Sequence, residues 1–217
     1  MSTLILLRHG QAAFGADNYD QLSDLGQRQA VATGAFWKAR ETKFSRVITG
    51  PRHRHVRTAE LALRHIDHPV PQVHPLLDEF SEGSAILAAA RARTGQDPPD
   101  RRARLQRYGE QIGDWSRGAA QMPGVPSAAD FRARVAKCLQ EITSSDTPSQ
   151  NVLAVTSAGV IAAAAVELLG LPDSMMADLM RLIRNCAISE ILFDARRRSL
   201  LSFNGASHRP PALLSLI

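Results

Sequence analysis

Short apolar runs alternate with longer amphipathic segments over most of the chain. Residues 4–7 and 151–156 are dominated by Leu, Ile, Ala and Val, as in strands that are buried on both faces of a sheet. Further strands are predicted at residues 44–49, 69–75, 187–193 and 199–203, with a hairpin turn between the last two.

Between these runs, apolar residues recur every three or four positions, which is the spacing of an amphipathic helix. Helices can start at Ser23 and at Ser127, which has Asp130 three residues later as in a capping box. The predicted helices cover residues 24–40, 56–65, 127–142, 160–169 and 173–184. Strands that alternate with helices predict an α/β fold, here a three-layer α/β/α sandwich around a mostly parallel sheet.

The pattern changes between residues 84 and 122, where Ala and Arg dominate and residues 96–99 interrupt the helical spacing. We interpret residues 84–122 as an inserted helical cap and expect substrate specificity to reside there. Its six arginines between Arg91 and Arg107 fit a solvated face, but could also attract an anionic substrate. No long linker divides the chain, so residues 1–217 are predicted to form a single domain.

Composition narrows the possible partners. The 217 residues are 44% hydrophobic and 22% charged, as in soluble globular proteins. The net charge of +5 favours anionic partners. Aromatic residues make up only 5% and do not alternate with basic ones, so no nucleic-acid partner is expected.

The sequence also predicts a cytoplasmic protein. Cys138 and Cys186 lie far apart in apolar surroundings, as buried free thiols do in a reducing compartment. Arg8 interrupts the first apolar run too early for a signal peptide, and no run is long enough to span a membrane. We therefore expect no membrane partner.

Polar residues that suit phosphate chemistry follow several predicted strands. The triplet Arg8-His9-Gly10 follows the first strand, Arg54 the second, and Glu79 lies in an acidic loop after the third. Ser157 precedes a helix whose N-terminus offers backbone N–H groups to an anion. Because the carboxyl ends of parallel strands share one edge of a sheet, these residues are expected to surround a common ligand.

Five segments spread over nearly the whole chain resemble the histidine phosphatase superfamily, which includes cofactor-dependent phosphoglycerate mutases. Leu7-Arg8-His9-Gly10 matches the family's signature triplet, and residues 22–30 are similar to its first-helix pattern. Residues 51–59 resemble the segment with the second phosphate-binding arginine. Residues 77–79 resemble the acid-bearing segment, and residues 202–204 the closing strand.

The resemblance implies a mechanism. His9 would attack phosphorus to form a phosphohistidine, while Arg8 and Arg54 hold the phosphoryl oxygens. Gln11 would be a further phosphate contact. Glu79 would protonate the leaving oxygen and later activate water.

Two alternatives concern the residues around these positions. Asp78 and Glu82 are rivals of Glu79 as the acid. His53 and His55 are interpreted as packing or rim residues, because no Cys or acidic residue has metal-ligand spacing to them. We therefore expect no metal site, and no cofactor is expected.

Ser157 departs from the family pattern, which usually has a second histidine there. A serine hydroxyl can still bind a phosphate oxygen, but it brings no positive charge. Loss of a charged donor costs about 1.5–3 kcal/mol, which slows a reaction roughly ten- to a hundredfold. We therefore expect Ser157 to contact phosphate and activity to be weakened or retuned.

These observations predict a phosphatase that hydrolyses a small phosphorylated metabolite through phospho-His9. The cap offers no evident set of extra phosphate ligands, which favours a phosphatase over a phosphoglycerate mutase-type enzyme. Such a mutase, or a phosphate-ester sensor in which Ser157 marks weakened catalysis, stays as the alternative.

Overall fold

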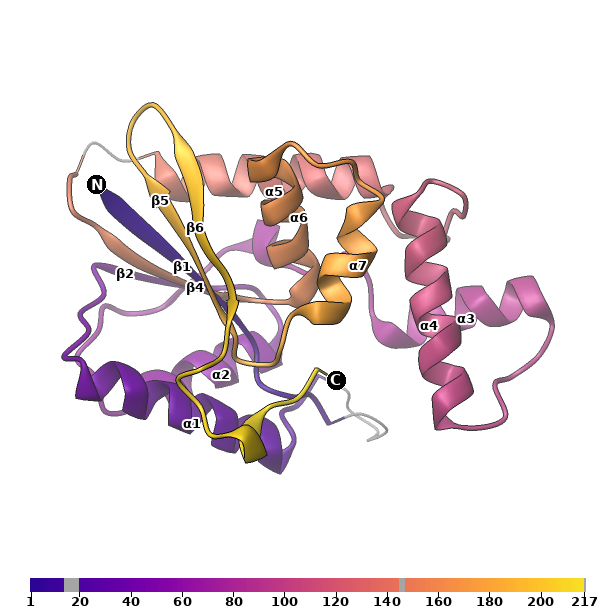
Figure 1. Cartoon of the computed structure of the whole chain (residues 1–217), viewed down its shortest axis with the longest axis horizontal. Helices are drawn as coiled ribbons and strands as arrows, with labels where there is room; N and C mark the ends of the chain where they lie inside the picture. The colour runs from indigo at the N-terminus through magenta and orange to yellow at the C-terminus, as the bar shows by residue number, and fades with distance from the viewer. Residues whose placement is uncertain (14–19, 145–146, 217) are drawn as a thin grey trace.

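The computed structural model describes residues 1–13, 20–144 and 147–216, whose arrangement is shown in Figure 1. They form a six-stranded sheet in the order β3-β2-β4-β1-β5-β6. The first four strands in this order are parallel, and β5 and β6 form the predicted antiparallel hairpin. The strands are β1 (Ser2–Arg8), β2 (Arg46–Thr49), β3 (Gln72–Val73), β4 (Asn151–Thr156), β5 (Ile188–Phe193) and β6 (Arg198–Gly205).

Helices cover both faces of the sheet, which confirms the predicted three-layer sandwich. α1 and α2 pack on one face, and α5 and α6 on the other (Figure 1). Within the described ranges, no helix is long and apolar enough to cross a membrane. The helices are α1 (Asp24–Ala39), α2 (His53–Leu63), α3 (Gly83–Thr94), α4 (Arg101–Ser116), α5 (Ala128–Thr143), α6 (Ala158–Leu169) and α7 (Met175–Leu182), with short 3-10 helices η1 (Pro75–Leu77) and η2 (Pro211–Leu213).

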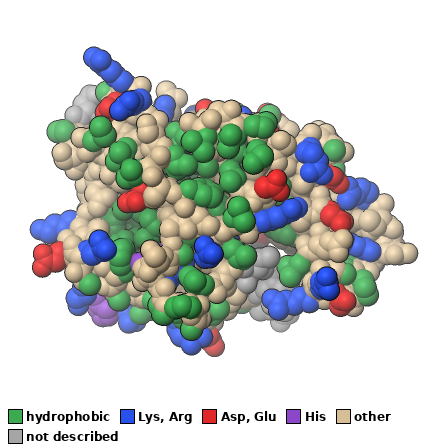
Figure 2. Space-filling model, viewed as in Figure 1, with side chains coloured by type: hydrophobic (Ala, Val, Ile, Leu, Met, Phe, Trp, Pro, Cys, Tyr) green, Lys and Arg blue, Asp and Glu red, His purple; other side chains and the backbone are tan. Residues whose placement is uncertain are grey.

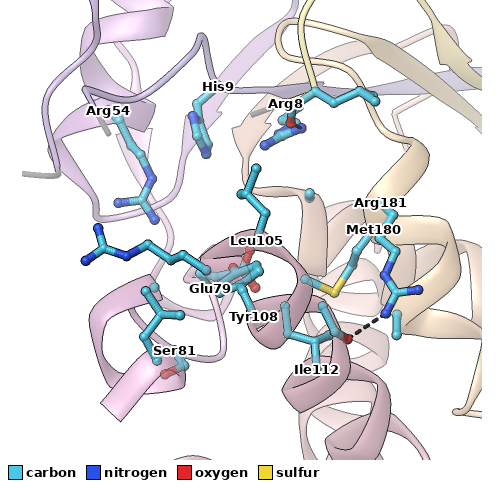
Figure 3. Close-up of a pocket in the computed structure, with 17 residues that line it drawn as sticks. Arg8, His9, Arg54, Glu79, Ser81, Leu105, Tyr108, Ile112, Met180 and Arg181 are labelled. Atoms are coloured by element: carbon cyan, nitrogen blue, oxygen red, sulfur yellow. Dashed lines mark hydrogen bonds between the residues drawn. The ribbon is translucent and has the colours of Figure 1, made fainter. Parts of the chain in front are cut away.

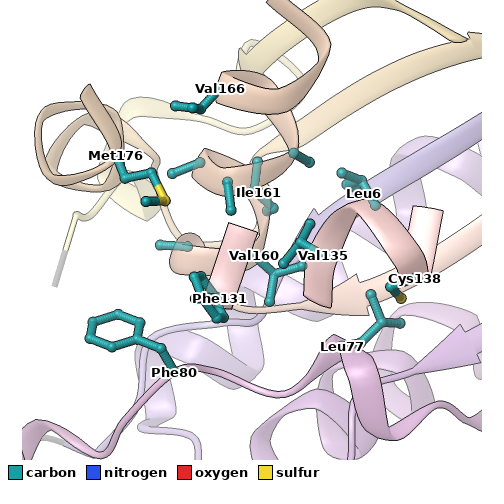
Figure 4. Close-up of a cluster of buried hydrophobic side chains, with 14 of the residues drawn as sticks. Leu6, Leu77, Phe80, Phe131, Val135, Cys138, Val160, Ile161, Val166 and Met176 are labelled. Carbon is teal, nitrogen blue, oxygen red and sulfur yellow. The ribbon is translucent and has the colours of Figure 1, made fainter. Parts of the chain in front are cut away.

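Hydrophobic clusters fill the space on both sides of β1. Because side chains alternate along a strand, Leu4 and Leu6 join the cluster under α5 and α6, which Figure 4 shows. Ile5 and Leu7 join the cluster under α1 and α2. The uninterrupted apolar run at the start of the chain is thus buried on both faces, and packing from both sides fixes the position of β1.

The predicted cap consists of α3 and α4, which extend away from the sheet beside α7 (Figure 1). Residues 96–99 lie between the two helices, and Gly95 ends α3 in the left-handed conformation, with φ of 69°. At the base of the cap, Trp115 stacks on Phe80 with 4.2 Å between ring centroids. Figure 2 shows basic side chains over this end of the molecule, where the exposed arginines are Arg91, Arg93, Arg101, Arg102 and Arg104.

Two helices begin earlier than the sequence predicts. α2 begins at His53, three residues early, and α6 at Ala158, two residues early. In both cases a carboxylate from elsewhere in the chain accepts a hydrogen bond from the first turn: Asp20 from the N–H of His53, and Glu79 from the N–H of Gly159. Helix starts satisfied by distant residues leave no signal in the local sequence.

The end of β1 meets α1 at a contact that has no room for side chains. A methyl group on Gly10 would overlap the carbonyl oxygen of Gly26, and one on Gly26 would overlap that of Gln11. Both obstacles are backbone atoms, which cannot move aside without shifting an element. The residues that follow β1 are therefore held against the first turn of α1.

We expect Gly26→Ala to lower the free energy of unfolding by about 1–3 kcal/mol, because the added methyl group forces β1 and α1 apart. Urea unfolding would measure the change. Gly113→Ala in α4 is the matched control, since its methyl group would meet only the half-exposed Arg117 side chain. The control should be neutral or stabilising by up to about 1 kcal/mol, and equal losses in both variants would contradict the packing argument.

Candidate functional site

The carboxyl end of the parallel strands and the cap enclose a cavity of about 230 Å³. Figure 3 shows four predicted site residues along its wall: Arg8 and His9 after the buried part of β1, Arg54 from α2, and Glu79 from the loop after η1. Arg8 and Arg54 carry guanidinium groups, His9 an imidazole and Glu79 a carboxylate. The cavity thus offers an anion-binding wall with an acid at the same place.

His9 is held in one orientation. Its backbone N–H donates to Thr156 at the end of β4, at 2.9 Å, and its Nδ1 lies 2.7 Å from the Gly10 carbonyl oxygen. Because a carbonyl only accepts, Nδ1 carries the ring hydrogen and Nε2 the lone pair. Burial, and then the guanidinium groups of Arg54 and Arg8, hold the pKa of His9 well below its usual value. The ring is therefore neutral at pH 7 and can act as a nucleophile.

Both arginines are anchored at the edge of the cavity. Arg8 donates through Nη1 to the carbonyl oxygens of Ile183 and Leu216, the latter at 2.7 Å. Arg54 is 3% exposed and donates through Nη1 to Oδ1 of Asp20 at 2.8 Å. Planar guanidinium groups held in this way suit the oxygens of a phosphoryl group.

Backbone N–H groups hold the carboxylate of Glu79 in place. Oε2 accepts from the N–H of Gly159 and Oε1 from the N–H of Phe80, each at 3.0 Å. A methyl group on Gly159 would overlap the Glu79 carboxylate, so a glycine is needed where α6 begins. The carboxylate is thus fixed at the wall of the cavity.

The two rival carboxylates have different surroundings. Asp78 and Glu82 both pair with the guanidinium group of Arg52, with 2.5 Å between Arg52 Nε and Asp78 Oδ1. Neither is among the residues that line the cavity, whereas Glu79 is. The geometry therefore favours Glu79 as the acid. Asp78 and Glu82 instead form ion pairs with Arg52.

Two predicted phosphate contacts lie away from the cavity wall. The side-chain oxygen of Gln11 accepts a hydrogen bond from Ser23 at 2.8 Å. Ser157 is 1% exposed, and its hydroxyl lies 2.7 Å from Nε2 of His55. Neither Gln11 nor Ser157 is among the described residues that line the cavity. The polar composition of residues 11–21 also predicts a loop over the site, and residues 14–19 of this segment lie outside the described residues.

His55 also lies in this region, next to Ser157. The sequence did not predict it as a residue of the site. It is fully buried, whereas His53 is exposed. The available signal is helical spacing: His55, Ala59 and Ala62 are separated by four and three positions and share the buried face of α2.

The opposite wall of the cavity is mostly apolar and comes from the cap and α7. Arg181 of α7 donates through Nη2 to the Gly109 carbonyl oxygen at 2.5 Å, the dashed line in Figure 3. The cap side chains Leu105, Tyr108 and Ile112 lie on one face of α4 at helical spacing. The cap and α7 side chains in this wall are Leu87, Arg104, Leu105, Tyr108, Ile112, Ala177, Met180 and Arg181.

In the part of the chain that the structure describes, no group of three or more His, Cys, Asp or Glu side chains is arranged to hold a metal ion. The polar wall instead combines an imidazole, two guanidinium groups and one carboxylate. Such a set suits an anionic ligand with a group to be protonated.

Comparisons with known proteins bear on the family and the fold of the chain. A sequence model of the histidine phosphatase superfamily (branch 1) matches residues 4–205. A comparison with curated proteins gave no match.

Several solved structures have a similar fold. Phosphoserine phosphatase from Entamoeba histolytica, in complex with 3-phosphoglyceric acid, has a TM-score of 0.70 at 18% identity, over 96% of this chain and 99% of the other. A mycobacterial glucosyl-3-phosphoglycerate phosphatase has a TM-score of 0.66 at 24% identity, over 95% and 100%. The α-ribazole phosphatase from Shigella flexneri has a TM-score of 0.66 at 21% identity, over 94% and 96%.

We expect the free energy of unfolding to fall as the pH drops below about 6.5. The pKa values of His9 and His55 are held well below the usual value, chiefly by burial. Below about pH 6.5 the unfolded chain therefore binds protons that the native state does not, and acid favours unfolding. Urea unfolding between about pH 7.5 and about pH 5 would measure the dependence.

Two variants test the source of this pH dependence. His55→Phe should flatten it, because one group with a lowered pKa is gone. His65→Gln should leave it unchanged, because His65 is exposed. An equally steep dependence in His55→Phe and the wild type would show that His55 is not responsible.

Proposed function

The chain belongs to the histidine phosphatase superfamily, and from this premise we propose that it is a phosphoric monoester hydrolase that transfers the phosphoryl group of a small metabolite to His9 and then to water. One observation carries the proposal: the neutral His9 ring, with its hydrogen fixed on Nδ1, lines a cavity together with Arg8, Arg54 and Glu79. These groups match the needs of phosphoryl transfer.

In the first step, Nε2 of His9 attacks phosphorus, and the bond from phosphorus to the ester oxygen breaks. Protonated Glu79 gives its proton to the leaving oxygen, so the alcohol departs neutral and Glu79 becomes a carboxylate. In the second step, water attacks phosphorus and gives a proton to Glu79, while the bond from phosphorus to Nε2 breaks. Phosphate is released and both side chains return to their initial forms.

The two arginines support the same scheme. Charge on the phosphoryl oxygens must be held in both steps, and a fixed donor is more effective than a mobile one because it needs no reorganisation. Arg8 and Arg54 are anchored by Leu216 and Asp20 before any substrate binds. Gln11 and Ser157 remain secondary candidates for phosphate contacts. In this geometry their side chains could affect the substrate only through neighbouring residues.

The cavity also bears on the substrate. Its volume of about 230 Å³ suits a small metabolite, and the apolar side chains of Leu105, Ile112 and Met180 suit a leaving group with an apolar part. We infer a small phosphorylated substrate, with neither a nucleic acid nor a membrane as partner. Both cysteines, Cys138 and Cys186, are buried free thiols, which supports a cytoplasmic location.

We expect His9→Ala to lose at least about a thousandfold in turnover of p-nitrophenyl phosphate, because no nucleophile replaces the imidazole. His53→Ala, an exposed histidine on the same helix as Arg54, is the control and should keep wild-type turnover. Wild-type enzyme quenched in alkali should retain acid-labile phosphate on His9. Full activity of His9→Ala would contradict the proposal.

The same assays separate the alternatives. Binding of phosphate esters by the wild type without turnover would favour a sensor. Transfer of phosphate between the hydroxyl groups of a phosphoglycerate, without release, would favour a mutase.

We expect Glu79→Gln to lower kcat by about 10²- to 10⁴-fold with an alkyl phosphate. The loss should be smaller in the phosphorylation step with p-nitrophenyl phosphate, whose leaving group needs little protonation. The amide oxygen of Gln can still accept from Gly159, but its NH2 group would face the N–H of Phe80, so urea unfolding of the variant is measured beside its turnover. Glu82→Gln is the control; an equal loss in both variants would contradict the assignment of the acid to Glu79.

A further inference from the structure

A buried histidine and a buried serine lie behind the proposed nucleophile. His55, in the first turn of α2, has no exposed surface, and Ser157, between β4 and α6, is 1% exposed. The Nε2 atom of His55 and the Oγ atom of Ser157 are 2.7 Å apart. Because an unpaired polar group is costly in the interior, this hydrogen bond offsets part of the cost of burying both side chains, although Nδ1 of His55 has no hydrogen-bond partner among the described residues.

The pair contacts His9 rather than the cavity. The rings of His55 and His9 have centroids 5.6 Å apart and are tilted by 38°. Neither His55 nor Ser157 is among the described residues that line the cavity, whereas His9 is. The ring contact between His55 and His9 is therefore the direct link between the pair and the residues that line the cavity.

The hydrogen bond to Ser157 holds His55 at Nε2, and the backbone of Gly50 packs close to its other ring nitrogen. A methyl group on Gly50 would overlap Nδ1. Burial, and then the guanidinium groups of Arg54 and Arg52, hold the pKa of His55 well below its usual value. His55 thus places a rigid and neutral imidazole against His9, without competing for the negative charge of a phosphoryl group.

We propose that His55 and Ser157 form a positioning pair that keeps the His9 imidazole in the orientation required for attack, an inference that rests on the proposed function of His9. Ser157 orients the His55 ring, and the His55 ring prevents the His9 ring from turning away from the Gly10 carbonyl oxygen. While Nδ1 stays on that oxygen, the Nε2 lone pair stays available to phosphorus. Misalignment of a nucleophile is costly because attack requires in-line geometry.

This arrangement offers a physical explanation for Ser157, at the position where the family usually has a histidine. The family resemblance predicts an imidazole at that position. Here the second imidazole near His9 comes from the residue that follows Arg54, and the serine holds it in place. His55 and Ser157 are therefore read as one functional unit, although 102 positions separate them in the chain.

Transient kinetics with p-nitrophenyl phosphate test the pair. His55→Phe keeps a ring of similar size but removes the hydrogen bond, and Ser157→Ala removes it from the other side. Each variant should slow phosphorylation of His9 about tenfold, which corresponds to ~1.4 kcal/mol in the barrier. The inhibition constant of inorganic phosphate should change less than about twofold, since Arg8 and Arg54 are untouched. The double variant should be no slower than either single one.

Rescue and spectroscopy separate positioning from a general loss of stability. His55→Gln can place an amide nitrogen near the position of Nε2 and should recover most of the phosphorylation rate. Long-range ¹H–¹⁵N spectra should show a single His9 tautomer, with hydrogen on Nδ1, in the wild type and a mixture in His55→Phe. If His55→Phe does not fold, Ser157→Ala and His55→Gln supply the same comparison.

The outcomes distinguish this inference from the proposed function. Wild-type phosphorylation rates and a single His9 tautomer in folded His55→Phe and Ser157→Ala, together with an inactive His9→Ala, would overturn the positioning pair alone. Activity in His9→Ala would overturn the proposed function itself. Slower phosphorylation that is additive in the double variant would also count against the pair, because the two side chains would then act separately.

Discussion

The site depends on the burial of guanidinium groups at one edge of the sheet. Arg54 is almost fully buried beside Asp20, and Arg52 is held between two carboxylates of the loop after η1. An isolated buried cation costs several kcal/mol, so these carboxylates must be present for the edge to fold. Burial, and then the guanidinium groups of Arg54 and Arg8, hold the pKa of His9 well below its usual value and keep its ring neutral. Glu79 is satisfied by backbone N–H groups and stays at the wall of the cavity.

Two of these carboxylates also complete helices. Asp20 accepts from the backbone of α2 and from the Arg54 side chain, so one group both starts the helix and anchors its arginine. Glu79 accepts from the first turn of α6, which links the acid to the helix that follows β4. The N–H groups at the N-termini of these helices thereby hold carboxylate side chains in position. Secondary structure and site geometry are coupled by the same few contacts.

The sequence could predict what depends on local pattern. The apolar run ending at Arg8 and His9 specifies a buried strand with polar residues at its end, and alternation of strands and helices specifies the sandwich. The start of α2 could not be predicted from the neighbouring sequence, because the carboxylate that caps it belongs to the distant residue Asp20. The role of His55 was missed for a similar reason: its partner Ser157 is remote in sequence, and a buried histidine is indistinguishable from a packing residue until both are placed in three dimensions.

The contact between Arg8 and Leu216 spans 208 positions of the chain. Loop closure over such a distance is entropically costly, so this contact forms late in folding. During synthesis, β1 emerges among the first segments, whereas its arginine acquires this carbonyl partner only after almost all the residues described here have been added. Because the sheet partners of β1 are β4 and β5, both the central strand and the cavity edge that carries His9 are completed only near the end of synthesis.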